Sequence, residues 1–129
     1  MRVVLANGCF DVLHVGHVRH LQEARDMGEW LIVSLTLDEH VNKGPGRPIN
    51  TWADRALVLR GLRCVSAVIP TANAVNAIRT VKPAIFVKGI DYAGGDRFTE
   101  DVQRACLEVG AKLHYTTTPK QSAFHQESA

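Results

Sequence analysis

Short apolar strands alternate with helices along the 129 residues of the chain, and this alternation constrains the fold more than any other feature. Strands connected through helices pair in parallel, because a parallel connection has to cross the sheet and a helix makes that crossing. We therefore predict an α/β fold with a single doubly wound parallel sheet of about five strands and flanking helices. The strands are predicted at residues 2–6, 30–36, 67–69, 84–88 and 112–115.

Capping residues and apolar periodicity place the helices between these strands. The predicted helices run from Val15 to a stop at Gly28, from a cap at Thr51, from a cap at Asn73 to Val81, and from a cap at Thr99 to Gly110. In the second helix, the side chains expected to face inward are those of Ala56, Leu57, Leu59 and Leu62.

Length, charge and cysteine content limit the function classes. A chain of 129 residues fits one domain, which we place at residues 1–129. The net charge of +2 comes from scattered basic residues, which argues against a nucleic-acid surface and leaves small anions as natural partners. Three cysteines at unrelated spacings indicate reduced thiols. Since neither a leader nor a membrane-spanning run is visible, we expect a cytoplasmic protein without membrane contacts.

Residues 7–20 join the first strand to the first helix and contain a glycine turn, an aspartate and three histidines. His14 and His17 lie at the predicted start of the helix, where free backbone N–H groups and the helix dipole favour an anion. Gly16 lets a phosphate chain approach the backbone. Asp38 and Lys88 follow or end other strands of the sheet, so we expect them at the same edge.

Three interpretations of this junction compete. In the first, the polar residues only cap the helix. In the second, they bind zinc, which imidazole ligands suit; the ligands would be Cys9, Asp11, His14, His17 and His20. In the third, the imidazoles donate hydrogen bonds to a nucleotide phosphate and stabilise the charge that grows during transfer. The third accounts for the glycines, the histidines and the helix start together, so we adopt it and predict no metal-ligating residues.

The string G-C-F-D-x-x-H-x-G-H at residues 8–17 closely resembles the signature of the cytidylyltransferase-like nucleotidyltransferases, which have a Rossmann-like sheet. Residues 43–50, 54–59 and 87–92 resemble, in the same order, segments of the adenylyltransferase domain that makes ADP-heptose. The resemblance extends from the first strand to about Tyr115 and therefore covers nearly the whole chain.

The resemblance implies roles for the residues at this edge. The Gly/Pro loop at residues 43–50 would close over a polyphosphate and bring cations to it, with Mg²⁺ accompanying the nucleoside triphosphate. For Arg55 the resemblance implies a contact with substrate phosphate. The alternative is an ion pair with Asp54 or a nearby glutamate. The predicted catalytic residues are His14, His17 and Lys43; the nucleotide-binding residues are Gly8, Cys9, Phe10, Asp11, Gly16, Lys88, Gly89, Asp91, Lys120 and Ser122; and the substrate-binding residues are Asp38, Arg47 and Arg55.

The end of the chain departs from the family pattern. Family members carry a serine- and threonine-rich turn, preceded by a glycine and often an arginine, that opens a final helix and grips the triphosphate. Residues 116–124 read TTTPKQSAF instead. Ser122 would supply the hydroxyl, and Lys120 would supply a point charge without the bidentate fork of arginine.

The resemblance implies a homodimeric enzyme that transfers a nucleoside monophosphate from ATP to a sugar phosphate such as heptose 1-phosphate and releases pyrophosphate. One alternative is a glycerol-3-phosphate cytidylyltransferase that uses CTP, although that family usually shows G-D-D-W where residues 89–92 read GIDY. A second alternative, suggested by the altered C-terminal turn, is a nucleotide-binding regulator that has lost turnover.

Overall fold

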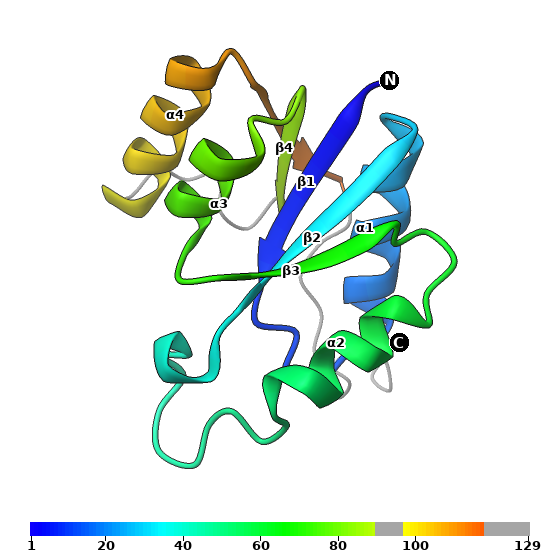
Figure 1. Cartoon of the computed structure of the whole chain (residues 1–129), viewed down its shortest axis with the longest axis vertical. Helices are drawn as coiled ribbons and strands as arrows, with labels where there is room; N and C mark the ends of the chain where they lie inside the picture. Colours follow the sequence, from blue (N-terminus) through cyan, green and yellow to red (C-terminus); the bar gives the residue numbers. More distant parts are fainter. Residues whose placement is uncertain (90–96, 118–129) are drawn as a thin grey trace.

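The structure is a computed structural model that describes residues 1–89 and 97–117 (Figure 1). Its elements are, in chain order, β1 (Val3–Gly8), α1 (Val15–Asp26), β2 (Trp30–Thr36), the 3₁₀ helix η1 (Asp38–His40), α2 (Trp52–Arg60), β3 (Ala67–Thr71), α3 (Ala74–Val81), β4 (Ile85–Gly89), α4 (Arg97–Val109) and β5 (Lys112–Thr116). In these residues no helix is long and apolar enough to cross a bilayer.

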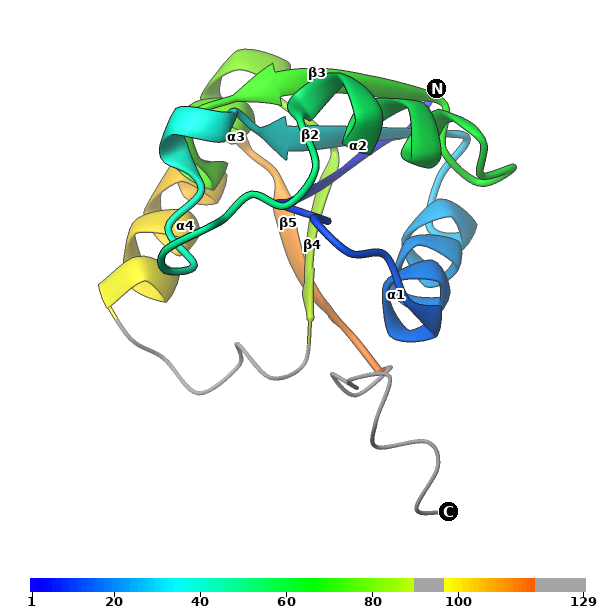
Figure 2. The ribbon, with the colours of Figure 1, turned by 90° about the horizontal axis from the view of Figure 1, so that it is seen from below.

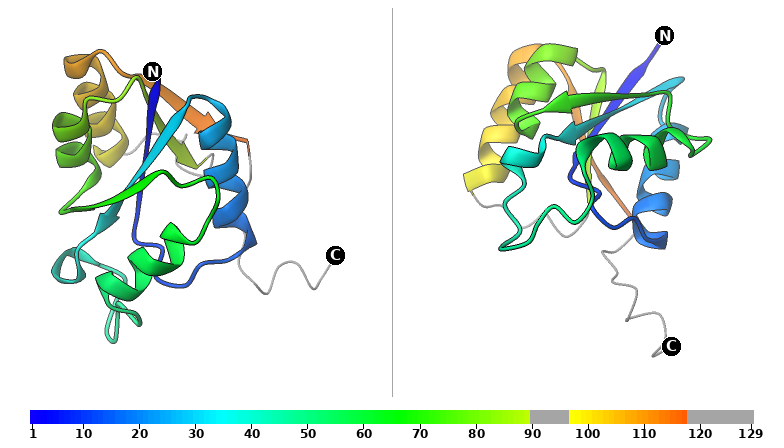
Figure 3. Two further views of the ribbon diagram at one scale, coloured as in Figure 1. Left: turned by 45° about the vertical axis from the view of Figure 1, so that its right-hand side comes forward. Right: turned by 60° about the horizontal axis from the view of Figure 1, so that its bottom comes forward.

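Five strands of the described chain form one parallel sheet in the order β3-β2-β1-β4-β5. Helices α1 and α2 cover one face, and α3 and α4 cover the other (Figures 1 and 3). The predicted doubly wound parallel sheet is therefore confirmed.

The central strand β1 is buried on both faces, which explains its continuous apolar run. Val4 and Ala6 pack in the cluster under α1 and α2, while Leu5 packs under α3 and α4. All three side chains are fully buried. Since β1 lies between β2 and β4, the strand order reverses beside it, and the crevice at the carboxyl ends of β1 and β4 is where open α/β sheets bind ligands. Figure 2 shows the molecule from this edge of the sheet.

Two predicted helix starts are confirmed by their caps. The Thr51 hydroxyl accepts a hydrogen bond from the Asp54 amide at 3.2 Å, and the Asn73 side chain accepts one from the Asn76 amide at 2.9 Å. The prediction for Thr99 was wrong, because α4 already begins at Arg97 and Thr99 lies buried within its first turn.

Other differences have simple physical causes. Leu57 is 69% exposed, contrary to our prediction, because a helix as short as α2 turns one narrow face to the sheet and Ala56 and Leu59 occupy it. Strand β1 continues to Gly8 because Asn7 and Gly8 pair in register with β2. Polar residues can therefore extend a strand wherever a neighbour supplies the ladder.

Candidate functional site

The end of β1 makes a tight turn that sets up the site. Phe10 has a φ of 43°, a left-handed backbone that is uncommon for a residue with a side chain. Its ring packs edge-on against the His17 ring, with 5.3 Å between centroids. A Cβ on Gly8 would lie 2.7 Å from the Phe10 ring, so any other residue there would have to displace that ring. Gly8 and Phe10 thus position the histidines.

His14 and His17 form the N-terminal cap of α1. The Nδ1 atom of His14 accepts a hydrogen bond from the Gly16 amide at 3.0 Å, and the Nδ1 atom of His17 accepts one from the His14 amide at 3.2 Å. The two rings lie 3.9 Å apart between centroids. Because each Nδ1 accepts a hydrogen bond, it carries no proton, so the N–H group of each ring is on Nε2.

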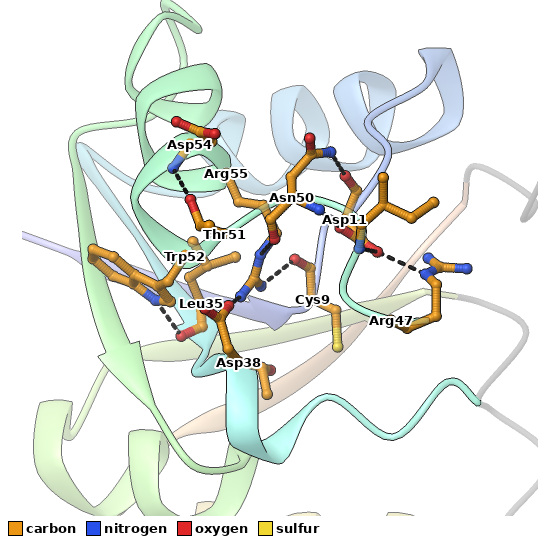
Figure 4. Close-up of polar contacts among 12 residues, drawn as sticks. Cys9, Asp11, Leu35, Asp38, Arg47, Asn50, Thr51, Trp52, Asp54 and Arg55 are labelled. Atoms are coloured by element: carbon orange, nitrogen blue, oxygen red, sulfur yellow. Dashed lines mark hydrogen bonds and ion pairs between the residues drawn. The ribbon is translucent and has the colours of Figure 1, made fainter. Parts of the chain in front are cut away.

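Asp11 is held by the loop that precedes α2 (Figure 4). Its Oδ2 accepts hydrogen bonds from Arg47 Nε at 2.6 Å and from the Ile49 amide at 2.7 Å, and its Oδ1 accepts one from the Asn50 amide at 2.9 Å. The Asn50 side chain donates in return to the Asp11 carbonyl at 2.6 Å. Burial acts to raise the pKa of Asp11, but these amides and Arg47 outweigh it and hold the pKa below its usual value.

Arg55 lies between three segments of the site and contacts all of them (Figure 4). Its fully buried side chain donates to the Cys9 carbonyl at 2.8 Å, to the Asn50 carbonyl at 3.1 Å and to the carboxylate of Asp38. The alternative pairing with Asp54 is not the one observed. Arg55 therefore braces the ends of β1 and β2 and the end of the loop against one another, as a planar five-donor group can.

The structure places the remaining predicted residues as follows. Lys43 is exposed on the loop, and Gly16 is buried in the first turn of α1. Lys88 is 8% exposed and shares with Phe86 the face of the sheet that α3 and α4 cover. Burial raises the pKa of Cys106, and the charge of Lys88 opposes this effect only in part. Gly89 ends β4. Asp91, Lys120 and Ser122 lie outside the described residues.

Most of the side chains proposed above as zinc ligands make separate contacts in the structure. Asp11 binds the loop, both His14 and His17 use Nδ1 to cap the helix, and His20 contacts the Thr116 hydroxyl at 2.7 Å. In the ranges 1–89 and 97–117, no three His, Cys, Asp or Glu side chains are grouped to hold a metal ion.

Sequence reasoning missed Asn50 as a site residue. Its backbone and side chain contact both Asp11 and Arg55. The available signal was an amide side chain next to the capping Thr51, in a loop that already carried Lys43 and Arg47.

Residues 5–122 match the profile of the cytidylyltransferase-like family. The chain belongs to this family of nucleotidyltransferases. It is 46% identical over 95 residues to the bifunctional protein HldE of Helicobacter hepaticus, and 47% identical over 107 residues to that of Pseudomonas entomophila. These matches cover 70% and 80% of this chain but 20% and 23% of the relatives, so the chain spans about a fifth of their length.

Two solved structures share the fold described above. The lipopolysaccharide core biosynthesis protein of Thermoplasma volcanium has a TM-score of 0.78 and 26% identity, over 93% of this chain and 99% of that one. Pantoate-beta-alanine ligase of Francisella tularensis, at 14% identity, shares the fold with a TM-score of 0.66, over 94% of this chain and 60% of that one. The family profile and the HldE relatives confirm the resemblance that residues 8–17 indicate.

Proposed function

We propose that this protein transfers AMP from ATP to the phosphate of heptose 1-phosphate and releases pyrophosphate. The observation that carries the proposal is the position of His14 and His17 at the start of α1, where both rings cap the helix through Nδ1 beside the carboxyl ends of β1 and β4. The similarity to HldE proteins supports heptose phosphate as the acceptor. We also propose that the protein acts as a cytoplasmic homodimer. Light scattering would test this by measuring its molecular mass in solution.

In the proposed reaction, an oxygen of the acceptor phosphate attacks the α-phosphorus of ATP in line. The bond from the α-phosphorus to the oxygen that bridges to the β-phosphate breaks, and its electron pair leaves with pyrophosphate. The attacking oxygen is already an anion, so no protein nucleophile is required. The protein has to align two anions and stabilise the charge on the α-phosphate, which is the role we assign to His14 and His17.

The two cationic side chains of the loop, Lys43 and Arg47, differ in how firmly they are held. Lys43 is exposed and precedes Gly44 and Gly46, whose φ values of 101° and 78° suit glycine alone. Arg47 is held by Asp11. We propose that residues 42–46 move as a flap that brings Lys43 onto the triphosphate, while Asp11 anchors the end of the loop.

Mg²⁺ would accompany the triphosphate. This ion keeps several waters and takes oxygen ligands from substrate phosphates and one or two carboxylates, so it needs no protein cage. The Asp38 side chain is 45% exposed and accepts from Arg55 through Oδ1, so Oδ2 would be the oxygen offered to the ion. The Asp11 side chain is 1% exposed and already accepts three N–H groups. The ion would supply charge neutralisation on the phosphates.

Trypsin tests the flap at a single bond, since it cleaves after Lys43 but not at Arg47, which precedes a proline. We expect cleavage after Lys43 to slow when a non-hydrolysable ATP analogue and Mg²⁺ are added. Cleavage after Arg63, an exposed residue between α2 and β3, is the internal control and should not change. Equal protection at both sites, or none at Lys43, would show that the loop does not close on nucleotide.

We expect ATP to be preferred over CTP. Residues 43–48 and 87–92 both resemble the heptose-type adenylyltransferases, and they are distant in sequence. A pocket that pairs with adenine leaves polar groups unpaired against the wrong base, so kcat/KM should differ at least about tenfold, or about 1.4 kcal/mol.

Pyrophosphate release tests the whole proposal. The four nucleoside triphosphates are assayed against heptose 1-phosphate, glycerol 3-phosphate and other sugar phosphates. Release from ATP with heptose 1-phosphate supports the proposal. A preference for CTP with glycerol 3-phosphate would support the cytidylyltransferase alternative, and nucleotide binding without release from any pair would support the regulator.

A further inference from the structure

A row of directed polar contacts connects α1 to the ends of β4 and β5. The Thr116 hydroxyl is fully buried and donates to the Lys88 carbonyl at 3.3 Å. The same hydroxyl oxygen lies 2.7 Å from Nδ1 of His20, a hydrogen bond whose direction is set by the tautomer of the imidazole. His20, Thr116 and the end of β4 form one chain of hydrogen bonds.

Glu23, one turn further along α1, holds the residue that follows β5. Its carboxylate accepts the Thr117 amide at 2.9 and 3.0 Å, the Thr117 hydroxyl at 2.8 Å and Nε2 of His114 at 3.2 Å. Burial acts to raise the pKa of Glu23, but these donors outweigh it and lower the pKa, so the group is charged at neutral pH. A charged acceptor with several donors makes a strong, directional contact.

These contacts lie on the helix that carries the phosphate-binding donors. His17, His20 and Glu23 follow one another at intervals of three residues on α1, and α1 lies beside β5 (Figure 3). Elsewhere α1 packs through Leu21 and Ala24 in the apolar core. Apolar contacts are not directional, whereas hydrogen bonds require particular distances and angles, so these polar contacts add a directional constraint to the position of α1.

We propose that His20 and Glu23 are positioning residues that set the place of α1 relative to β4 and β5, and so aim the Nε2–H donors of His14 and His17. The inference rests on the proposed function where it concerns rate. A misplacement of about 1 Å in a reacting geometry can cost about 10²-fold in rate. Loss of these contacts therefore lowers kcat more than it weakens substrate binding.

The test compares Glu23→Gln with Glu108→Gln, a matched control whose carboxylate pairs with Arg79 in an exposed contact between α3 and α4. We expect Glu23→Gln to lower kcat at least about tenfold, with KM for ATP changed less than about threefold. Glu108→Gln should leave both within about twofold. Circular dichroism and thermal melting establish that each variant is folded at the assay temperature.

A second pair of variants separates positioning from folding. Thr116→Ser keeps the hydroxyl and should retain wild-type kcat, while Thr116→Val keeps the shape, loses the hydroxyl and should lower kcat as Glu23→Gln does. Two-bond ¹H–¹⁵N spectra of the imidazoles report the place of His14 and His17 without any substrate. Their signals should shift in Glu23→Gln and Thr116→Val, and not in the controls.

The imidazole signals decide the inference. If the His14 and His17 signals are unchanged in both Glu23→Gln and Thr116→Val, the positioning role is overturned whatever the rates do. If the signals shift while wild-type protein releases no pyrophosphate from any substrate pair, the positioning role stands and the proposed function fails.

Discussion

Replacing His14 by asparagine is expected to lower kcat by about 10²-fold or more while leaving the thermal stability nearly unchanged. Asparagine is among the best N-cap residues, so its side-chain oxygen can replace the cap that His14 Nδ1 makes with the Gly16 amide. It cannot replace the Nε2–H group on the far side of the ring. The variant therefore removes the proposed phosphate donor and keeps the helix start.

The same separation is available at His17. Its Nδ1 atom occupies the position of a capping box, where glutamine is a natural acceptor, so His17→Gln should keep the contact with the His14 amide. We expect a similar loss of kcat. His40→Asn, at an exposed histidine of η1, is the matched control and should be silent.

Pyrophosphate release gives kcat, and a thermal melt run on the same samples gives stability. If His14→Asn and His17→Gln turn over as fast as wild type, the histidines are only helix caps, which is the simplest interpretation of the sequence. If both variants lose stability together with activity, the cap and not the Nε2–H donor carries the effect.

The sequence predicts the fold well because burial on both faces leaves a local signal. The strand Trp30–Thr36 is predicted to the residue, since an apolar run bounded by polar turns permits little else. Asn73 likewise marks a helix start through a contact only three residues long. The prediction that Leu57 faces inward is wrong because the local sequence does not indicate whether an apolar residue near the edge of a helix face will be covered.

The site is predictable only where its contacts are local. The spacing of His14 and His17 places both at a helix start, but it does not tell which ring nitrogen faces the backbone. Arg47 lies 36 residues from Asp11 in sequence, and Thr116 lies 96 residues from His20. Residues this far apart in sequence meet only because the strand order brings their segments together, so the local sequence does not predict the pair. The buried Arg55 is of the same kind, because a charged residue in a helix usually indicates an exposed face.

Asp11→Asn is expected to release the loop at residues 47–50 and to lower both stability and activity. Asparagine has the same shape, but its amide group would face either Arg47 and the Ile49 amide or the Asn50 amide, which are all donors. Each buried N–H left without an acceptor costs about 1–3 kcal/mol, so we expect a loss of about 2–4 kcal/mol in the free energy of unfolding. Since residues 47–50 anchor the proposed flap, kcat/KM should fall about 10²-fold.

The pH dependence of stability provides a second readout. The pKa of Asp11 is lower in the folded protein than in the unfolded chain. Its charge therefore stabilises the fold above the unfolded value of about 3.9, and this contribution disappears as the pH falls through the lower, folded value. In Asp11→Asn the contribution is absent at every pH. The stability difference between wild type and variant should then shrink as both are acidified below pH ~4.

Chemical denaturation between acid and neutral pH, together with trypsin cleavage after Lys43, measures both effects. Asp54→Asn is the matched control, because this exposed aspartate in the first turn of α2 should contribute less than about 1 kcal/mol through the helix dipole. The sequence-based role for Asp11 was direct binding of nucleotide. If that role is the true one, Asp11→Asn will keep its stability and its protected loop and will only raise KM for ATP. Loss of stability with faster cleavage after Lys43 would instead assign Asp11 to the loop.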